Sequence, residues 1–254
     1  MPKPDIYLSV IVPAYNEAGR IEKTLRRFNE YFAKQTYTYE ILVVNDGSKD
    51  GTSEIVDKMI GEIRNMRMID RKQNKGKGYT VREGMLASYG RIRLFTDADN
   101  ATDISHFEKM RPYFDKNFEV VICSRDERDA PGARQAVKQP FWKRLFGNMG
   151  NLYIQWMAVK GIWDTQCGFK AFRDFAAEKI FLLARIDRWA FDVEALAIAR
   201  KMDYRIAIVP AYWENDPKTH VNIRSYFKTL WEVFKISRLM RRLSWRLYQN
   251  DELA

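Results

Sequence analysis

The chain has 254 residues with 46% hydrophobic and 30% charged content, and its formal net charge is +10 at pH 7. That hydrophobic content supports a substantial buried core, and the length fits one large α/β domain with a C-terminal extension. The two cysteines, Cys123 and Cys167, lack CxxC spacing, which excludes a disulfide framework and favours buried free thiols in a reducing, cytoplasmic setting.

Membrane-spanning and export segments are not expected. Lys, Arg, Asp or Glu interrupts every apolar stretch before it reaches the roughly 18 residues that a spanning helix needs. The first residues, Met1 to Asp5, lack the regions of a signal peptide. The basic excess suits an anionic partner such as nucleotide phosphates, acidic lipid or nucleic acid. Because the sequence has no recognisable nucleic-acid readout motif, we expect no nucleic acid partner.

In chain order, the first half alternates between strand-like and helical patterns. Strands are expected at 7–12, 40–45, 66–70 and 91–96, and helices at 18–32, 52–63 and 78–89. This alternation predicts an α/β fold with a mainly parallel sheet and helices on both faces. Ligands collect at the carboxyl ends of such strands, so we expect Asn16, Asp46 and Asp97 to converge on one crevice.

The second half is less regular. Its patterns predict strands at 120–124 and 205–209 and helices at 140–159, 175–183, 192–201 and 226–248. We therefore expect a main domain over residues 1–222 and a basic, amphipathic helical extension over residues 223–254.

The segment Asp97-Ala-Asp99 follows the fourth expected strand. Two hard oxygen ligands this close together suit Mg²⁺ or Mn²⁺, which would bridge to a diphosphate. An isolated Asp-x-Asp also recurs in ordinary surface turns, so the motif gains weight only from its neighbours.

Two further turns offer groups for a nucleotide. Asp46 ends a strand and can accept hydrogen bonds from a base or ribose, although the same residues also read as an ordinary turn before a helix cap. Lys75 and Lys77 stand among glycines ahead of a helix, where ammonium and amide groups approach phosphates. The turn lacks the full P-loop and dinucleotide patterns, which disfavours a kinase or a dehydrogenase.

Taken in order, four motifs resemble the family 2 inverting glycosyltransferases of GT-A, Rossmann-like architecture: Val10-Ile-Val-Pro-Ala-Tyr-Asn-Glu17, Val43-Val-Asn-Asp-Gly-Ser48, Asn74-Lys-Gly-Lys-Gly78 and Thr96-Asp-Ala-Asp99. Two more are similar to the dolichyl-phosphate β-glucosyltransferase branch, close to the dolichyl-phosphate mannose synthases: Asp164-Thr-Gln-Cys-Gly-Phe-Lys170 and Arg188-Trp-Ala-Phe-Asp-Val-Glu194. The resemblance covers roughly residues 6 to 220.

The resemblance implies roles for individual positions. A nucleotide-sugar donor would be bound by Pro13, Tyr15, Glu17, Asp46, Lys75, Lys77, Asp97 and Lys218. Asp97 and Asp99 would hold Mg²⁺ or Mn²⁺, and Asp97, Arg125 and Asp164 would act in catalysis. Arg125 would neutralise a phosphate, while Asp164 would act as base or position the acceptor phosphate. Related mannose synthases carry a metal-binding Gln where this chain has Ala101, a departure that glucosyl-type relatives share.

A lipid acceptor would require contact with a membrane interface. Aromatic and basic side chains alternate from Phe141 to Trp156 and again from Phe227 to Arg246, as in helices that lie on anionic membranes. The alternative is that these helices pack on the domain or on a second copy in a homo-oligomer.

The resemblance implies transfer of glucose from UDP-glucose to a polyprenyl phosphate, dolichyl or undecaprenyl, with inversion, by a peripheral enzyme on the cytoplasmic face of the membrane. Another nucleotide sugar, GDP-mannose or a UDP-N-acetylhexosamine, remains an alternative, as does a glycan or protein acceptor. From a different class, a non-catalytic nucleotide-sugar sensor also fits. The motifs fix neither the sugar nor the length of the polyprenyl chain.

Overall fold

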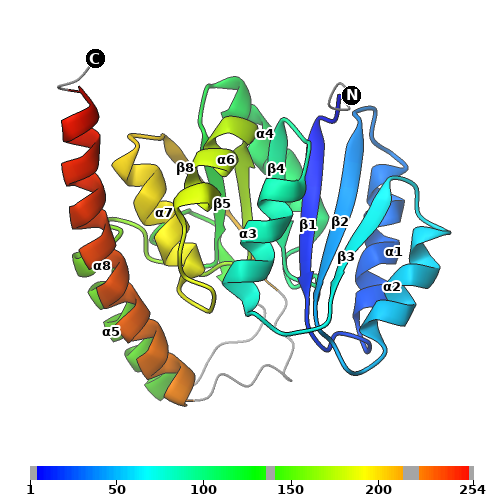
Figure 1. Ribbon diagram of the computed structural model, residues 1–254, viewed down its shortest axis with the longest axis horizontal. Coiled ribbons are helices and arrows are strands. Elements are labelled where there is room, and N and C mark those ends of the chain that lie inside the picture. Colours follow the sequence, from blue (N-terminus) through cyan, green and yellow to red (C-terminus); the bar gives the residue numbers. More distant parts are fainter. Residues whose placement is uncertain (1–4, 136–140, 214–222, 252–254) are drawn as a thin grey trace.

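The computed structural model describes residues 5–135, 141–213 and 223–251. Its centre is a seven-stranded sheet in the order β3-β2-β1-β4-β7-β5-β8 (Figure 1). The strands are β1 (Leu8–Ala14), β2 (Tyr39–Asp46), β3 (Met66–Arg71), β4 (Ile92–Thr96), β5 (Val120–Ser124), β7 (Phe169–Arg173) and β8 (Ile206–Pro210). A small parallel pair joins β6 (Arg134–Gln135) to β9 (Tyr212–Trp213).

The sheet is mainly parallel, as the sequence predicts. β1 pairs in parallel with β2 and β4, β2 with β3, and β5 with β8. β1 is buried over its whole length, because parallel strands covered on both faces have no side open to water. Pro13 fits there because β4 pairs with β1 only as far as Ile11, so no β4 partner faces its missing N–H.

Helices cover both faces. One face carries α1 (Ile21–Phe32), α2 (Thr52–Ile60), the short 3₁₀ helix η1 (Ile104–His106) and α4 (Phe107–Asp115). The other carries α3 (Lys77–Ala87), α6 (Asp174–Leu183) and α7 (Phe191–Lys201), with α5 (Phe141–Met157) and α8 (Ile223–Asp251) outside them. In α1, Ile21, Leu25 and Phe28 follow helical spacing and are fully buried, which explains why this segment packs as a helix.

β7 is the main departure from the expected topology. It lies between β4 and β5 and is antiparallel to both, with Phe169 opposite Thr96. It therefore begins at the edge where the parallel strands end. The sequence analysis also left η1, α4, β6 and β9 unassigned, whereas the other expected elements are present with ends shifted by a few residues.

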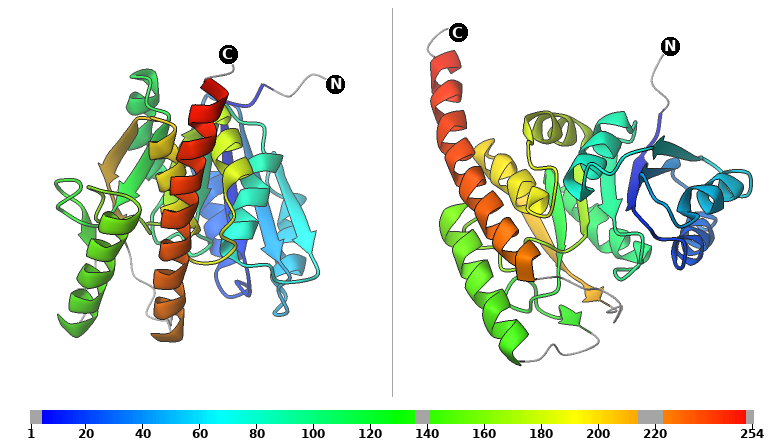
Figure 2. Two further views of the ribbon diagram at one scale, coloured as in Figure 1. Left: turned by 60° about the vertical axis from the view of Figure 1, so that its left-hand side comes forward. Right: turned by 60° about the horizontal axis from the view of Figure 1, so that its bottom comes forward.

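α5 and α8 pack against each other, and α8 also contacts α7 (Figure 2). Within the described ranges, no helix combines the length and apolar content needed to cross a bilayer. Cys123 and Cys167 are both buried and free, as expected.

Candidate active site

The loops after β1 and β2 are tied together at the carboxyl edge of the sheet. The Asn16 amide N–H donates to Ser48 Oγ at 2.9 Å, and Asn16 Oδ1 accepts from the Lys49 amide at 2.9 Å. Asn16 adopts a positive φ of 56°, which asparagine tolerates better than most residues. Tyr15, just before it, is 45% exposed. This clasp places Tyr15 and Glu17 beside the end of β2.

Asp46, at the end of β2, is saturated with hydrogen bonds. Its Oδ1 accepts from the Lys75 amide at 2.8 Å and from Arg71 Nη2 at 2.6 Å, and its Oδ2 accepts from the Gly76 amide at 2.8 Å. Gly76 has φ 102°, and a Cβ there would lie 2.4 Å from the Asp187 carbonyl oxygen. Asp46 therefore fixes the lysine-glycine turn against the sheet edge.

The acidic pair after β4 lies next to two cations. Lys77 Nζ contacts Asp97 Oδ1 at 2.5 Å, and Arg20 Nη1 lies 4.0 Å from Asp99 Oδ2. Arg20 also forms an ion pair with Glu17, so the loop after β1 reaches the acidic pair. The structure thus brings Glu17, Lys77, Asp97 and Asp99 together.

Gly168 packs directly on Asp97. The Asp97 amide donates to the Gly168 carbonyl at 3.2 Å, and an added Cβ at Gly168 would lie 2.1 Å from Asp97 Oδ2. Only glycine allows this approach without moving the carboxylate. The start of β7 therefore helps to position Asp97.

The acidic pair suits a divalent cation. Burial and the neighbouring Asp97 charge raise the pKa of Asp99, and burial raises the pKa of Glu17. A cation would relieve this crowding of negative charge. The described residues contain no group of three or more His, Cys, Asp and Glu side chains arranged to hold a metal. Two carboxylates completed by donor phosphates and water are the usual arrangement for Mg²⁺, so these residues fit the expected metal.

Arg125 and Asp164 form a closed pair at the end of β5. Asp164 accepts from Arg125 Nε, Nη2 and the Arg125 amide, each at 2.8 Å. Burial alone would raise the pKa of Asp164, but Arg125 holds it below its ordinary value. The pairing makes Asp164 a weak proton acceptor and suits it to positioning Arg125. The Arg125 guanidinium also lies 5.1 Å from the centre of the Trp213 ring.

A second buried pair joins Lys170, which the sequence analysis left without a role, with Asp192. The resemblance places Asp192 on the acceptor or sugar side, together with Arg188, Trp189 and Glu194. Lys170 Nζ in β7 is fully buried and donates to Asp192 Oδ1 at 2.6 Å, and Asp192, the second residue of α7, has 6% of its side chain exposed. The Trp189 ring, 52% exposed, lies 5.9 Å from Lys77 Nζ. All three residues fall in or beside motifs that the sequence analysis quoted for their resemblance, which was the available signal.

His106 is another residue that the sequence analysis missed. It is buried, donates from Nδ1 to the Asp103 carbonyl at 2.9 Å, and accepts at Nε2 from the Tyr212 amide at 3.1 Å. His106 lies in η1, which follows the acidic pair along the chain. Its hydrogen bond to Tyr212 therefore links the loop after β4 to β9. Burial lowers its pKa, consistent with a neutral ring in this role.

The remaining predicted residues are less constrained. Lys75 is exposed, with its Nζ 3.3 Å from the Tyr79 hydroxyl and 4.5 Å from the ring centre. Lys218 lies outside the described residues. Its expected role stays a prediction.

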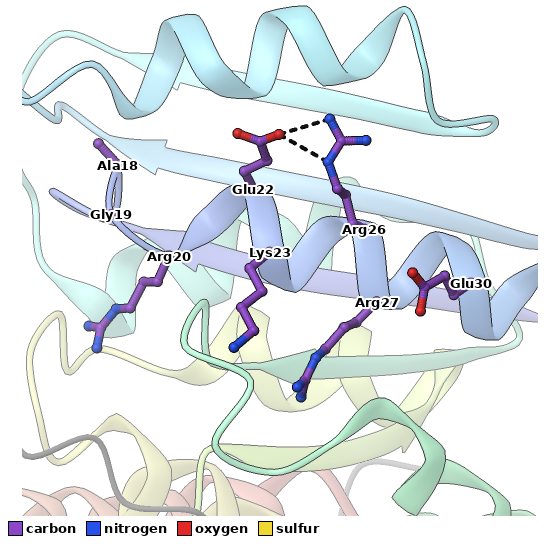
Figure 3. A pocket seen from close by; sticks show the side chains of 8 residues that line it. All are labelled: Ala18, Gly19, Arg20, Glu22, Lys23, Arg26, Arg27 and Glu30. Atoms are coloured by element: carbon purple, nitrogen blue, oxygen red, sulfur yellow. Dashed lines mark hydrogen bonds and ion pairs between the residues drawn. The ribbon is translucent and has the colours of Figure 1, made fainter.

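A shallow hollow runs along the outer surface of α1, beside this site. It is lined by Ala18, Gly19, Arg20, Glu22, Lys23, Arg26, Arg27 and Glu30 (Figure 3). The side chains of Arg20, Lys23 and Arg27 point to the same side of the helix, and Glu22 pairs with Arg26. The hollow meets the acidic pair only through Arg20, so we place the candidate site at the sheet edge rather than on this helix.

Comparison with known proteins identifies the family of the chain. Residues 9–181 match the family described as Glycosyl transferase family 2. The chain is 38% identical over 222 residues to the dolichyl-phosphate beta-glucosyltransferase of Dictyostelium discoideum, covering 84% of this chain and 68% of that protein. It is 35% identical over 224 residues to the human protein of the same name, covering 83% and 68%.

Solved structures share the GT-A fold. Mannosyl-3-phosphoglycerate synthase from Rubrobacter xylanophilus superposes with a TM-score of 0.66 at 15% identity, covering 97% of this chain and 75% of that one. Glucosyl-3-phosphoglycerate synthase from Mycobacterium tuberculosis, in complex with Mn²⁺, UDP and glucosyl-3-phosphoglycerate, gives 0.61 at 17% identity, covering 91% and 78%. At these identities the likeness establishes the fold alone.

Proposed function

Because this chain belongs to glycosyl transferase family 2, in the branch of the dolichyl-phosphate β-glucosyltransferases, we propose that it transfers glucose from UDP-glucose to a polyprenyl phosphate with inversion. The product is polyprenyl phosphate β-glucose, on either a dolichyl or an undecaprenyl chain. The observation that carries the proposal is the meeting of Glu17, Lys77, Asp97 and Asp99 at the carboxyl edge of the sheet. Oxygen ligands for a cation and an ammonium group for phosphate lie together there.

The donor's nucleotide lies on the side of β1 and β2. Pro13, Tyr15 and Asp46 line this side, with Tyr15 exposed at its mouth. Asp46 acts mainly by holding the turn that carries Lys75 and Lys77, since its oxygens already accept three hydrogen bonds. Lys75, exposed at that turn, is free to approach the donor diphosphate.

Asp97 and Asp99 hold Mg²⁺ or Mn²⁺. A divalent cation held by these residues would supply positive charge to offset that of the diphosphate. Lys77 sits against Asp97 and can turn from the carboxylate toward phosphate oxygens when the donor arrives. Lys218 is proposed to close on the same phosphates.

The acceptor phosphate supplies the nucleophile. One of its oxygens forms a bond to the anomeric carbon while the bond from that carbon to the UDP oxygen breaks, and attack from the opposite face inverts the configuration. A phosphate monoester is already anionic near neutral pH, so the step needs no strong base. Asp164 then serves to aim Arg125, whose guanidinium offsets phosphate charge.

The acceptor's lipid tail lies in a membrane, so the enzyme needs a surface that binds to one. We propose that α5 and α8 form this surface. α5 exposes Met149, Leu152 and Trp156 at helical spacing, with Trp156 80% exposed. Further along the chain, α8 exposes Trp231 among four cations at the same spacing: Lys228, Lys235, Arg238 and Arg242. Exposed aromatic and basic side chains on adjacent helices suit an anionic lipid interface. We therefore place the protein as a peripheral enzyme on the cytoplasmic face.

Vesicle co-sedimentation tests this placement. Wild-type protein should bind vesicles containing phosphatidylserine and lose most binding in high salt or on neutral vesicles. Replacing Lys235 and Arg238 with Glu should weaken binding to anionic vesicles, while replacing Lys34 and Lys72 with Glu, a matched charge change elsewhere, should do so less. Equal binding by both double variants would reject these helices as the membrane surface, and association of the protein into a homo-oligomer through them would favour the alternative.

Transfer of radiolabelled glucose from UDP-glucose into the organic phase tests the enzymatic proposal. Wild-type protein with dolichyl or undecaprenyl phosphate and Mg²⁺ should form labelled lipid, and chelation or Asp99→Ala should abolish it. Asp103→Ala is the matched control, because its carboxylate lies in the same loop but caps η1 by accepting from the Ser105 amide. No labelled lipid with either acceptor would reject the acceptor, and unchanged turnover in Asp99→Ala would reject the metal assignment.

A further inference from the structure

The Arg125–Asp164 pair is formed by two loops that lie far apart in the chain. Arg125 directly follows β5, whereas Asp164 lies in the loop between α5 and β7. Their hydrogen bonds join the two side chains to each other but do not hold the loops on the sheet. The direction in which the Arg125 guanidinium points therefore depends on what fastens the two loops together.

The carboxylate of Asp129 bonds to both loops. Its Oδ1 accepts from the Trp163 amide at 2.8 Å, and its Oδ2 accepts from the Asp164 amide at 2.8 Å. Oδ2 also accepts from the hydroxyl of Ser124, the last residue of β5, at 2.8 Å. Hydrogen bonds to a charged acceptor are stronger than those between neutral groups. Asp129 thus connects the backbone of Asp164 to the residue immediately before Arg125.

A compact turn brings Asp129 back to the strand from which the chain has just emerged. The Asp126 amide donates to Ser124 Oγ at 3.1 Å, and the Asp129 amide donates to the Asp126 carbonyl at 3.1 Å. Asp129 is half-buried in this turn, and Ala130 after it is buried. The carboxylate is therefore held between the two loops by its own backbone and does not reach them from a mobile side.

Arg128 adds a second contact between the same loops. Its guanidinium carbon lies 3.7 Å from the centre of the Trp163 ring, and its Nη2 forms an ion pair with Asp126 at 2.5 Å. Arg128 Nη2 also donates to Asn148 Oδ1 in α5 at 3.1 Å. The turn after β5 is thus fixed to the loop that carries Asp164 and to a helix outside the sheet.

We propose that Asp129 is a positioning residue, which holds the two loops so that Arg125 directs its guanidinium at the acceptor phosphate. This role rests on the proposed function, because it takes the acceptor to be the phosphate that Arg125 neutralises. Asp129 touches no substrate and acts through Arg125. Without its carboxylate the Trp163 and Asp164 amides lose their acceptor, and a displacement of the guanidinium by about 1 Å costs up to about 100-fold in rate.

The position of Arg125 can be measured without any substrate. Its Nε–H donates to Asp164 Oδ2 at 2.8 Å and should give a slowly exchanging NMR signal, assigned by its absence from Arg125→Lys. Asp129→Asn should speed this exchange about 10- to 100-fold, because the amide NH₂ of asparagine donates where a carboxylate oxygen accepts. Asp126→Asn is the matched control, since the Asp126 carboxylate pairs with Arg128 instead. Unchanged exchange in Asp129→Asn would overturn the inference.

Acceptor kinetics measure the consequence for the reaction. Glucose transfer from UDP-glucose to farnesyl phosphate, a short-chain polyprenyl phosphate, gives kcat/KM for the acceptor. Asp129→Asn should lower this value about 10 to 100 times and change the calorimetric affinity for UDP-glucose less than about twofold. Asp126→Asn should keep both values. Equal losses on the donor and acceptor sides would overturn the inference, because Asp129 would then support the fold as a whole.

A double-mutant cycle identifies the residue through which Asp129 acts. Arg125→Lys keeps a positive charge beside Asp164 but loses the two-pronged guanidinium. In that background Asp129→Asn should lower kcat/KM little further, and fully additive losses would overturn the inference. If Asp129→Asn does not fold, Ser124→Ala takes its place, because it removes one of the three donors to Asp129. The same loss confined to the acceptor side, of smaller size, is then expected, and equal losses would again contradict the role.

The positioning role and the proposed function fail in different ways. A wild type that transfers no glucose to lipid phosphate rejects the proposed acceptor, while the exchange of the Arg125 signal still decides whether Asp129 positions this residue. Transfer to farnesyl phosphate by a wild type whose Arg125 signal is insensitive to Asp129→Asn supports the proposed function and rejects the positioning role.

Discussion

The carboxylates at the carboxyl edge of the sheet fall into two groups. Asp46 and Asp164 each accept three hydrogen bonds, at least one of them from an arginine side chain. Asp97 and Asp99 lie close together in like charge, and each has a cationic neighbour: Lys77 Nζ at 2.5 Å from Asp97 and Arg20 Nη1 at 4.0 Å from Asp99. Saturated carboxylates stabilise the loops that carry a site, whereas under-bonded carboxylates are available to a ligand.

The largest effect on stability is expected at Asp164. Asp164→Ala leaves the buried Arg125 guanidinium without its partner, which should lower the free energy of unfolding by about 3–5 kcal/mol. Urea denaturation of the variant and the wild type measures the difference. A decrease of less than about 1 kcal/mol in the free energy of unfolding would show that Asp164, like Asp97 and Asp99, contributes little to the fold.

The pH dependence of the free energy of unfolding should also reveal the contribution of the Arg125–Asp164 pair. Because the pKa of Asp164 is lower in the folded protein than its ordinary value of 3.8, the unfolded chain binds more protons between the two values. The contribution of Asp164 is therefore complete above that ordinary value and is lost as the pH falls through the folded pKa. Denaturation of the wild type and Asp164→Asn should differ most near pH 7 and converge in strong acid, and a constant difference would contradict the assignment.

A smaller loss is expected at Asp46. Asp46→Asn keeps the shape of the side chain but removes the charge that Arg71 and two amides recognise, so the free energy of unfolding should fall by about 1.5–3 kcal/mol. Because the turn with Lys75 and Lys77 depends on this clasp, UDP affinity should fall with it. Thermal denaturation and calorimetry measure the two effects, and weaker UDP binding at unchanged stability would indicate that Asp46 contacts the nucleotide directly.

Much of the first half of this edge could be predicted from the sequence. The βα units repeat locally, and Asp46, Lys77, Asp97 and Asp99 stand at fixed places after strands or before helices. β7 could not be predicted, because its partners β4 and β5 are brought to it by the fold and not by local pattern. The burial of Lys170 likewise depends on Asp192, which lies 22 residues further along the chain.

The ion pairs of the site residues also could not be predicted from the sequence. The sequence assigned Arg125 to neutralising a phosphate and Asp164, separately, to acting as base or positioning the acceptor phosphate. Only the structure shows the two side chains bonded to each other over a separation of 39 residues. The contact between Arg20 and Asp99 is likewise visible only in the structure. It arises because the loops after β1 and β4 meet at neighbouring strand ends.

The smallest effect should have the opposite sign. Burial and the charge of Asp97 raise the pKa of Asp99, so its charged form is disfavoured in the folded protein. Asp99→Asn keeps the hydrogen bond from the Ala101 amide and removes the repulsion, which should stabilise the protein by about 1 kcal/mol near neutral pH. Thermal denaturation without metal measures this gain. A clear loss of stability would show that the charge of Asp99 supports the fold.

The most direct test of the division is metal binding itself. Binding of Mn²⁺ in the presence of UDP, followed by electron paramagnetic resonance, should be clear for the wild type and for Asp103→Asn, and absent for Asp99→Asn. This result would identify the under-bonded pair as the metal site independently of turnover. Equal Mn²⁺ binding by wild type and Asp99→Asn would contradict the account.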